Sequence, residues 1–549
     1  MTENHSGMRR VNFTAIDERR IFEAEVYWEH GRITRVVELG DEVPGLGYLI
    51  PGFIDAHVHI ESAMLPPTEF GRLALRHGTV AVVCDPHEIA NVLGLEGVRF
   101  MIDNARSTPF NAFFGAPSCV PATPFETAHG RLGCQEIEAL LAEPEVCCLS
   151  EMMNVPGVLA RDPQVMEKIA LAARLGYPVD GHAPGLKGAD AASYVGAGIS
   201  SDHECFSMEE ARDKIRAGMW VLIREGSAAR NLDVLAPLIA ESPRQVMFCS
   251  DDKHPDDLLT GHINQMAARA VAAGYDPFEV LACACLNPIA HYQLPLGRLQ
   301  VGDFMDGVEV SDLTAFQPVR VWLKGELVVS HGEVLLARKL VKPVNIFNAT
   351  EIVPADVMVP STGGPIRVIE VRDGSLVTGQ KQLRPAIRNG LISADLERDI
   401  LPIAVLNRYQ PAKPALGFVQ GFGLKRGAIA SSVAHDSHNI IAVGVNSRAL
   451  CRVVNEIIAH QGGIAVADGE TLDILPLPIG GIMSDQPGEQ VALAYSRLDR
   501  RARQLGSPLR APLMTLSFMA LLVIPELKLS DKGLFDGCRF QFVELSVGE

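Results

Sequence analysis

Eight strand-like apolar segments follow one another between Tyr48 and Pro255. Stretches with helical spacing lie between them, for example Asp162–Leu175, Ser207–Ala217 and Asp256–Ala273. Alternating strands and helices predict a parallel sheet, and eight such units predict an α/β fold with a closed (β/α)8 barrel. The runs are Tyr48–His59, Thr79–Cys84, Asn111–Phe114, Val146–Ser150, Tyr177–Gly181, Gly198–Asp202, Trp220–Ile223 and Val246–Ser250.

Segments on both sides of this region also have strand patterns. The segment Arg10–Gly47 contains alternating runs, and Val319–Leu323 is separated from Leu327–Val329 by a three-residue turn. From about Val344 the chain continues for some two hundred residues with strands of its own and a helical stretch at Arg448–His460. A chain of 549 residues is long enough for several cores, so we expect more than one domain.

Residues that bind metals stand at the ends of five of the eight runs. Because the carboxyl ends of barrel strands share one face, these side chains should converge although they are far apart in sequence. A single histidine at a strand end is more often structural, but six suitable residues at one face favour one or two divalent cations, with Glu151 able to bridge them. The six residues are His57, His59, Glu151, His182, His203 and Asp251.

The order of these residues resembles the amidohydrolase superfamily of metal-dependent hydrolases and, within it, the adenine deaminase family. The resemblance extends over nearly the whole chain. Its motifs begin at His57 (HVHIES), Asp85 (DPHEIANV), Glu151 (EMMN), Gly181 (GHAPG), Ser201 (SDHE), Arg224 (REGSA), Ser250 (SDDKHP), Gly421 (GFGLKRG) and His435 (HDSHN).

The resemblance implies a division into domains. Residues 1–50 and 301–343 should form the two parts of one small β-sandwich. Residues 51–300 should form the amidohydrolase barrel, and residues 344–549 an additional C-terminal α+β domain of the adenine deaminase type.

The resemblance also implies the reaction adenine + water → hypoxanthine + ammonia, in purine salvage. A cyclic amidase of the dihydroorotase or hydantoinase kind is the alternative among enzymes. Such enzymes usually bridge their metals with a carboxylated lysine where this chain has Glu151. A catalytically inactive purine-binding relative is a further alternative, and the presence of all six ligand positions argues against it.

Asp251 and Glu88 are the residues expected to move protons. Asp251 should accept a proton from the attacking water, and Glu88, with Glu204 as the second choice, should protonate a ring nitrogen so that ammonia can leave. Glu88 is equally suited to cap the helix that starts beside it.

Four further residues are expected to bind the substrate. Arg224 and Glu225 can hydrogen-bond the purine edge or form a structural ion pair. Asp436 and His438 follow a predicted strand, Ala428–Val433, and can close the site against water or simply shape a turn.

Charge and composition limit the partners. A net charge of −17 and a pI near 5.4 argue against nucleic acid, so a small molecule is the expected substrate. No apolar run is long enough for a membrane span, and the N-terminus lacks a signal-peptide core, so we expect a cytoplasmic protein. Ligation by histidine and carboxylate without thiolate accepts Mn, Fe or Zn, and of these we expect Mn. We expect a homodimer.

Overall fold

The computed structural model describes residues 5–547, which form two compact units. Unit 1 consists of the chain up to Pro86, Phe100–Cys119 and Gly133–Leu340. Unit 2 consists of His87–Arg99, Val120–Leu132 and the chain from Val341 onward. Residues 1–4, which entered the expectation about a signal peptide, lie outside the described residues.

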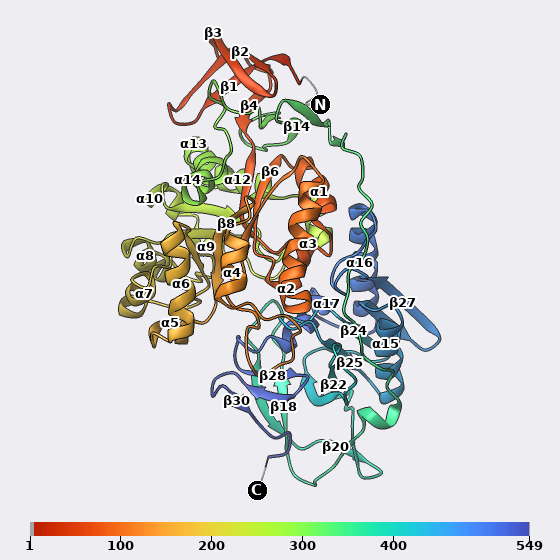
Figure 1. The fold of residues 1–549 in the computed structure, drawn as a ribbon. Helices are drawn as coiled ribbons and strands as arrows, with labels where there is room; N and C mark the ends of the chain where they lie inside the picture. Colours follow the sequence, from red (N-terminus) through yellow and green to blue (C-terminus); the bar gives the residue numbers. More distant parts are fainter. Residues whose placement is uncertain (1–4, 548–549) are drawn as a thin grey trace. The chain divides into compact units, whose positions relative to one another are not determined.

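Eight parallel strands of unit 1 form the barrel, which confirms the predicted fold class (Figure 1). One ladder joins β5 to β9 and another joins β10 to β12. Ser200 N donates to Val179 O at 2.8 Å between the two ladders, and Asp251 N donates to His57 O at 2.9 Å where the last strand meets the first. The strands are β5 (Phe53–Val58), β6 (Thr79–Cys84), β7 (Asn111–Ala116), β8 (Val146–Met152), β9 (Val179–Gly181), β10 (Ser201–Asp202), β11 (Trp220–Arg224) and β12 (Val246–Cys249).

Helices connect these strands. The predicted helix Asp256–Ala273 is two helices, because Gly261 adopts an extended backbone (φ 172°, ψ 167°) and interrupts the helical hydrogen bonds. The described helices are α1 (Pro67–Arg76), α3 (Leu95–Arg106), α4 (Cys134–Leu141), α5 (Val155–Leu159), α6 (Pro163–Leu175), α7 (Gly188–Val195), α8 (Met208–Arg216), α9 (Leu232–Leu235), α10 (Leu238–Glu241), α11 (Pro255–Thr260), α12 (Ile263–Ala272), α13 (Pro277–Leu281) and α14 (Asn287–Tyr292).

The first predicted strand is also divided, at Gly52. A Cβ atom at Gly52 would lie 2.2 Å from a methyl carbon of Val80, so glycine allows the chain to pass close to β6. The residues before Gly52 form β4 (Tyr48–Pro51), which belongs to a different sheet.

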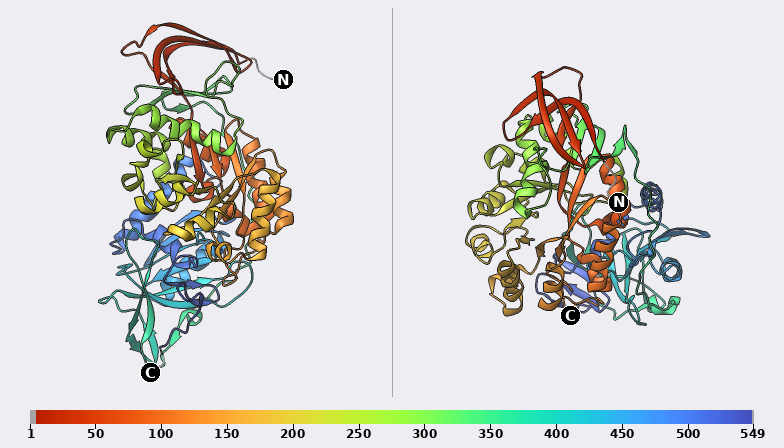
Figure 2. Two further views of the ribbon diagram at one scale, coloured as in Figure 1. Left: turned by 90° about the vertical axis from the view of Figure 1, so that its left-hand side faces the viewer. Right: turned by 45° about the horizontal axis from the view of Figure 1, so that its top comes forward.

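That sheet is built from both sides of the barrel, in the order β16-β15-β14-β13-β4-β1-β2-β3. Trp28 of β2 packs edge-on against Trp322 of β14 with 6.0 Å between ring centroids, although β2 and β14 are not neighbours in the sheet. The sheet therefore curls around its own core, as its N-terminal strands show in Figure 2. Its other strands are β1 (Gly7–Ala15), β2 (Arg20–Glu29), β3 (Arg32–Asp41), β13 (Gly307–Val310), β14 (Pro318–Leu323), β15 (Glu326–Ser330) and β16 (Glu333–Val334).

Unit 2 contains another eight-stranded sheet, in the order β19-β18-β23-β22-β25-β24-β26-β27. The predicted helix near Arg448 is α15 (Ser447–Ala459), whose apolar face packs on β24, β25 and β26. The sheet strands are β18 (Ile366–Glu370), β19 (Gly379–Leu383), β22 (Ile400–Leu406), β23 (Ala415–Gln420), β24 (Ala428–Ser431), β25 (Ile440–Gly444), β26 (Gly463–Asp468) and β27 (Thr471–Pro476).

Smaller elements complete unit 2. They are β17 (Val359–Pro360), β20 (Ala386–Arg388), β21 (Leu391–Ser393), β28 (Leu527–Ser530), β29 (Gly533–Asp536), β30 (Gln541–Phe542), α2 (His87–Leu93), α16 (Gly488–Gln504) and α17 (Pro512–Ser517). Among the described residues, no helix has both the length and the apolar character that crossing a membrane requires.

Candidate functional site

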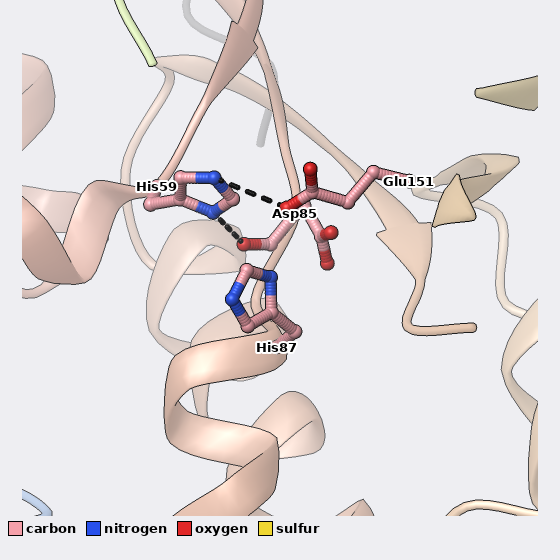
Figure 3. Close-up of side chains that lie close together, drawn as sticks. All are labelled: His59, Asp85, His87 and Glu151. Carbon is pink, nitrogen blue, oxygen red and sulfur yellow. Dashed lines mark hydrogen bonds and ion pairs between the residues drawn. The ribbon is translucent and has the colours of Figure 1, made fainter. Parts of the chain in front are cut away.

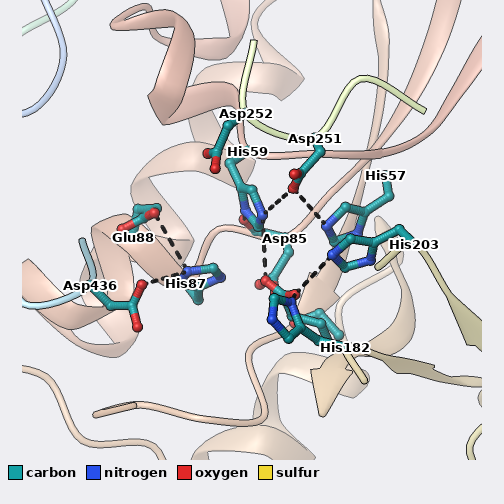
Figure 4. A network of polar contacts seen from close by, with 12 residues as sticks. His57, His59, Asp85, His87, Glu88, His182, His203, Asp251, Asp252 and Asp436 are labelled. Atoms are coloured by element: carbon teal, nitrogen blue, oxygen red, sulfur yellow. Dashed lines mark hydrogen bonds and ion pairs between the residues drawn. The ribbon is translucent and has the colours of Figure 1, made fainter. Parts of the chain in front are cut away.

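The structure brings the six predicted metal ligands together in unit 1 (Figure 3 for Glu151, Figure 4 for the others). Two overlapping groups have ligand atoms within 4.8 Å of one another: His57 with Glu151 and His203, and His57 with His59 and Asp251. His182 joins through His203 in a third such group, which also contains Glu204. We call the six residues the ligand cluster: His57, His59, Glu151, His182, His203 and Asp251.

Glu151, in β8, lies between two sets of imidazoles. Its Oε1 is 3.4 Å from His59 Nε2. Its Oε2 is 2.8 Å from His182 Nδ1 and 3.3 Å from His203 Nε2. One carboxylate thus presents a different oxygen to each set, which is the arrangement that a bridging ligand requires.

His59 is oriented by the backbone of the neighbouring strand end (Figure 3). Its Nδ1 lies 3.0 Å from the carbonyl oxygen of Asp85. A carbonyl only accepts, so Nδ1 carries the hydrogen and Nε2 carries the lone pair. That Nε2 faces Glu151 Oε1 and also Asp251 Oδ1, at 3.2 Å. A histidine held in this way is typical of metal sites.

Two other imidazoles of the cluster are also suited to bind a cation. His57 Nε2 and His203 Nε2 are buried and have no hydrogen-bond partner within the part of the chain that the structure describes. A buried nitrogen without a partner is costly, and a metal ion bound to it removes that cost. The donor set of imidazole nitrogens and carboxylate oxygens suits Mn, Fe or Zn.

Arg224, at the end of β11, bonds two acidic residues. Its guanidinium donates to Asp251 Oδ2 at 2.5 Å and to Glu204 through both terminal nitrogens. Asp251 is therefore held from one side by Arg224, while its Oδ1 faces the imidazoles. Glu225 instead pairs with Arg269 and accepts a hydrogen bond from a backbone amide of α9.

Charged neighbours shift the pKa values of residues in the ligand cluster. Burial alone would raise the pKa of Glu151, but His182 and His203 outweigh it and hold that pKa well below its usual range. Burial likewise opposes the charged form of Asp251, but Arg224 and the neighbouring imidazoles outweigh it, so the pKa of Asp251 is also well below its usual range. Burial would lower the pKa of His182, yet the carboxylates of Glu204 and Glu151 raise it to about 9. Both carboxylates are therefore ionised and ready to bind a cation.

Glu88, the predicted proton donor, belongs to a separate group in unit 2. Its two carboxylate oxygens contact His435 Nδ1 and His438 Nε2. His438 Nδ1 accepts a hydrogen bond from Ala434 N at 3.3 Å, so its hydrogen is on Nε2 and points at Glu88. Burial opposes the charge on Glu88, but the histidines outweigh it and hold its pKa well below the usual range. Glu88 is thus a carboxylate.

Asp436 lies between His435 and His438 in sequence and is also buried. Its Oδ1 is 3.9 Å from His87 Nε2, and its Oδ2 has no hydrogen-bond partner among the described residues (Figure 4). Glu126, which the sequence analysis did not select, is buried in the same unit and carries a similarly unpartnered oxygen. Glu126 stands in a loop without strand or helix periodicity, and no local pattern distinguishes it.

Comparisons with known proteins agree with the geometry. The model of the Amidohydrolase family matches residues 48–328, and that of the Adenine deaminase C-terminal domain matches residues 375–541.

Three curated relatives, each named adenine deaminase, match nearly end to end. The protein of Salinibacter ruber is 52% identical over 531 residues, covering 96% of this chain and 97% of its own. That of Methanosarcina mazei is 49% identical, covering 97% and 98%. That of Parabacteroides distasonis is 45% identical over the full length of both chains. With a matching barrel, a matching C-terminal domain and relatives of this similarity, the chain belongs to the adenine deaminase family of amidohydrolases.

Proposed function

We propose that this chain hydrolyses adenine to hypoxanthine and ammonia with a pair of divalent cations held by the ligand cluster. The observation that carries the proposal is the position of Glu151, whose two oxygens face two separate sets of imidazoles. Membership of the family supplies the substrate, because the curated relatives carry the name adenine deaminase.

Bound divalent cations lower the pKa of water and so supply a nucleophile near neutral pH. The protein residues then have to manage protons and charge. Asp251 is an ionised carboxylate with one oxygen on Arg224 and the other toward the imidazoles, so it is suited to accept a proton. Arg224 keeps Asp251 in place and neutralises Glu204 beside it.

Departure of ammonia requires that a ring nitrogen be protonated. Glu88 is our candidate for this step, and its environment determines its protonation state before the step. Because Glu88 is a carboxylate that accepts two imidazole hydrogens, it must first receive a proton before it can donate one. We therefore propose that Glu88 shuttles the proton, with His435 and His438 orienting its two oxygens.

We propose different roles for the four residues that were expected to bind the substrate. Asp436 has a buried oxygen available for a ligand. His438 acts through Glu88, and Arg224 acts through Asp251 and Glu204. Glu225 is engaged by Arg269, so we assign the ion-pair role to it more readily than a purine contact.

We further infer a manganese-dependent homodimer that acts in purine salvage in the cytoplasm. The ligand cluster contains nitrogen and oxygen donors and no thiolate, which is compatible with Mn, Fe or Zn. Metal analysis of the purified protein and light scattering after size-exclusion chromatography test the cation and the dimer.

The central experiment measures ammonia release after the metal has been removed with a chelator. Protein reconstituted with Mn, Fe or Zn is offered adenine, adenosine, cytosine, guanine and dihydroorotate. We expect turnover of adenine, restored by two equivalents of metal per chain and absent from the metal-free protein.

Two other outcomes separate the alternatives. Hydrolysis of dihydroorotate without deamination of adenine would identify a cyclic amidase. Adenine binding by metal-loaded protein with no ammonia released under any metal would identify an inactive purine-binding relative. Either result contradicts the proposal.

A further inference from the structure

The barrel of unit 1 has a seam between β9 and β10, and two members of the ligand cluster lie beside it. Among the described residues, β5–β9 and β10–β12 form separate ladders. His182 follows β9, which has three residues, and His203 follows β10, which has two. The backbone bond from Ser200 N to Val179 O joins the two strands three residues before either ligand. The sheet itself therefore does little to fix the two histidines relative to each other.

Lys214, in α8, bonds both sides of this seam. Its Nζ donates to Ala183 O at 2.7 Å, in the residue after His182. It also donates to Asp202 Oδ2 at 2.5 Å, in the residue before His203. Asp202 Oδ1 in turn accepts a hydrogen bond from Ala183 N at 2.9 Å. These three contacts tie the chain beside one ligand to the chain beside the other.

Glu210 completes the arrangement from the same helix. It precedes Lys214 by one helical turn, and its Oε1 lies 2.8 Å from Lys214 Nζ. Its two oxygens also accept hydrogen bonds from Gly185 N at 2.8 Å and from Phe206 N at 3.0 Å, each three residues after a ligand. We call Lys214, Asp202 and Glu210 the lysine hub.

The lysine hub is charged and fully buried. The side chains of Lys214, Asp202 and Glu210 are 0%, 0% and 1% exposed. Burying charged groups is costly, and apolar side chains of similar size would fill the same space without that cost. What the charges add is direction, because an ammonium group must stay within hydrogen-bond reach of its acceptors, whereas apolar contacts tolerate displacement.

Direction matters at this seam because the two histidines face one carboxylate oxygen. His182 Nδ1 and His203 Nε2 lie 2.8 and 3.3 Å from Glu151 Oε2 (Figure 4 for the histidines). Metal–ligand distances vary by only about 0.2 Å, so a shift of one strand end against the other would separate the donors. Contacts behind the ligands commonly determine metal affinity for this reason.

We propose that Lys214 is a positioning residue for the metal centre, which holds the two sides of the seam together so that His182 and His203 present their nitrogens to one cation. The inference rests on the proposed function, in which the ligand cluster holds a pair of divalent cations. It predicts that one of the two cation sites depends on Lys214. The other site, on His57, His59 and Asp251, should depend on it much less.

The test titrates metal-free protein with Mn²⁺ by isothermal calorimetry. Lys214→Met keeps an unbranched side chain but loses the ammonium group, so Ala183 O and Asp202 lose their shared donor. We expect the affinity for one Mn²⁺ to fall by roughly 10- to 100-fold, while the affinity for the other changes by less than about threefold. Adenine turnover should fall at limiting Mn²⁺ and recover in excess Mn²⁺.

Two comparison variants separate positioning from stability. Lys528→Met removes a fully buried lysine of unit 2 whose Nζ donates to two backbone carbonyl groups. It should leave both Mn²⁺ affinities at the wild-type values, whatever its melting temperature. The second is a neutral variant that combines Lys214→Met, Asp202→Asn and Glu210→Gln. Because it leaves no charge of the hub buried without a partner, it should fold and still lose affinity at one Mn²⁺ site.

Unchanged Mn²⁺ affinities in Lys214→Met, with a lower melting temperature, would overturn the inference, because the hub would then serve stability alone. Equal losses at both sites would also contradict it, since the effect would not be local to the seam. If Lys214→Met does not fold, as circular dichroism would show, the neutral variant decides by the same two criteria. Failure of the neutral variant to fold would overturn the inference too, because the hub would then be required for the fold.

Failure of the proposed function gives a different pattern. A wild-type protein that binds two Mn²⁺ but releases no ammonia from adenine would refute the proposed reaction and leave the role of Lys214 standing. A wild-type protein that takes up no divalent cation would refute the proposed metal centre itself.

Discussion

At the residue scale, Glu151 is the part of the ligand cluster with the sharpest expected phenotype. Replacing Glu151 with Gln keeps the size of the side chain but removes its charge, so both sets of imidazoles lose their shared carboxylate. We expect the bound metal, measured by plasma mass spectrometry, to fall below two per chain and adenine turnover to fall by at least about 100-fold. Glu209→Gln is the matched control, since Glu209 is exposed and pairs with Lys187 outside the cluster. Full metal content and activity in Glu151→Gln would show that Glu151 is not a bridging ligand.

A second prediction at this scale concerns the proton on Glu126. The groups that face it are Asp436 and Asp531, which raise its pKa, and the hydroxyls of Thr123 and Ser437, which lower it. Since its pKa is raised to about 8, Glu126 in the folded chain is protonated below that pH and ionised above it. The unfolded chain releases this proton near the ordinary pKa of 4.5, so we expect the melting temperature to decline as the pH rises from there through about 8. In Glu126→Gln this decline should be smaller, and an identical decline in both proteins would assign it to other groups.

Site residues at strand ends can be predicted from the sequence, whereas a buried residue in a loop cannot. Strand ends in a barrel are geometrically equivalent, so a ligand type that recurs after successive apolar runs, as at His182 and His203, already predicts convergence. Glu126 lies in a loop, and its neighbours Asp436 and Asp531 are hundreds of residues away. Only the folded chain reveals that environment, because no local pattern encodes it.

At the scale of elements, the turn after β24 is held by the segment that follows β22. Arg408 N donates to Asn439 Oδ1 at 3.0 Å, and the Tyr409 hydroxyl donates to Ser437 O. Tyr409→Phe removes only that hydroxyl and leaves the Ser437 carbonyl without its donor. We expect a loss of about 1 kcal/mol and a melting temperature lower by roughly 2–4 °C. Tyr275→Phe, in unit 1, is the control, and an unchanged melting temperature for Tyr409→Phe would mean that the turn does not need this bond.

Strand patterns predicted the presence of the barrel elements better than their limits. The run Tyr48–His59 is continuous in hydropathy, yet it contributes to two sheets because Gly52 lets the backbone pass close to Val80. The helical spacing of Asp256–Ala273 likewise continues through Gly261, where the backbone is extended. Hydrophobic periodicity records which side chains are buried, and it does not record where tertiary contacts interrupt an element.

At the scale of the whole molecule, unit 2 depends on two short segments that precede most of it in the chain. His87–Arg99 supplies Glu88 to His435 and His438, and Val120–Leu132 supplies Phe125 to an aromatic group. We predict that residues 341–549 expressed alone do not reach the native structure of the unit. The fragment should bind a hydrophobic dye and show poorly dispersed amide resonances, whereas the full chain should do neither. A well-dispersed spectrum from the fragment would show that the two segments are dispensable for folding.

The mixed sheet of unit 1 has a consequence for the order in which the protein can be completed during translation. β4 pairs with β1 on one side and with β13 on the other, and the chain for the whole barrel lies between β4 and β13. At a synthesis rate of ~5–20 residues per second, β4 waits on the order of 10–50 s for its second neighbour. An unpaired edge strand exposes backbone groups that can recruit other chains. The yield of soluble protein should therefore depend less on the final stability of the barrel than on the protection of nascent β4. A lower growth temperature or a chaperone should provide that protection.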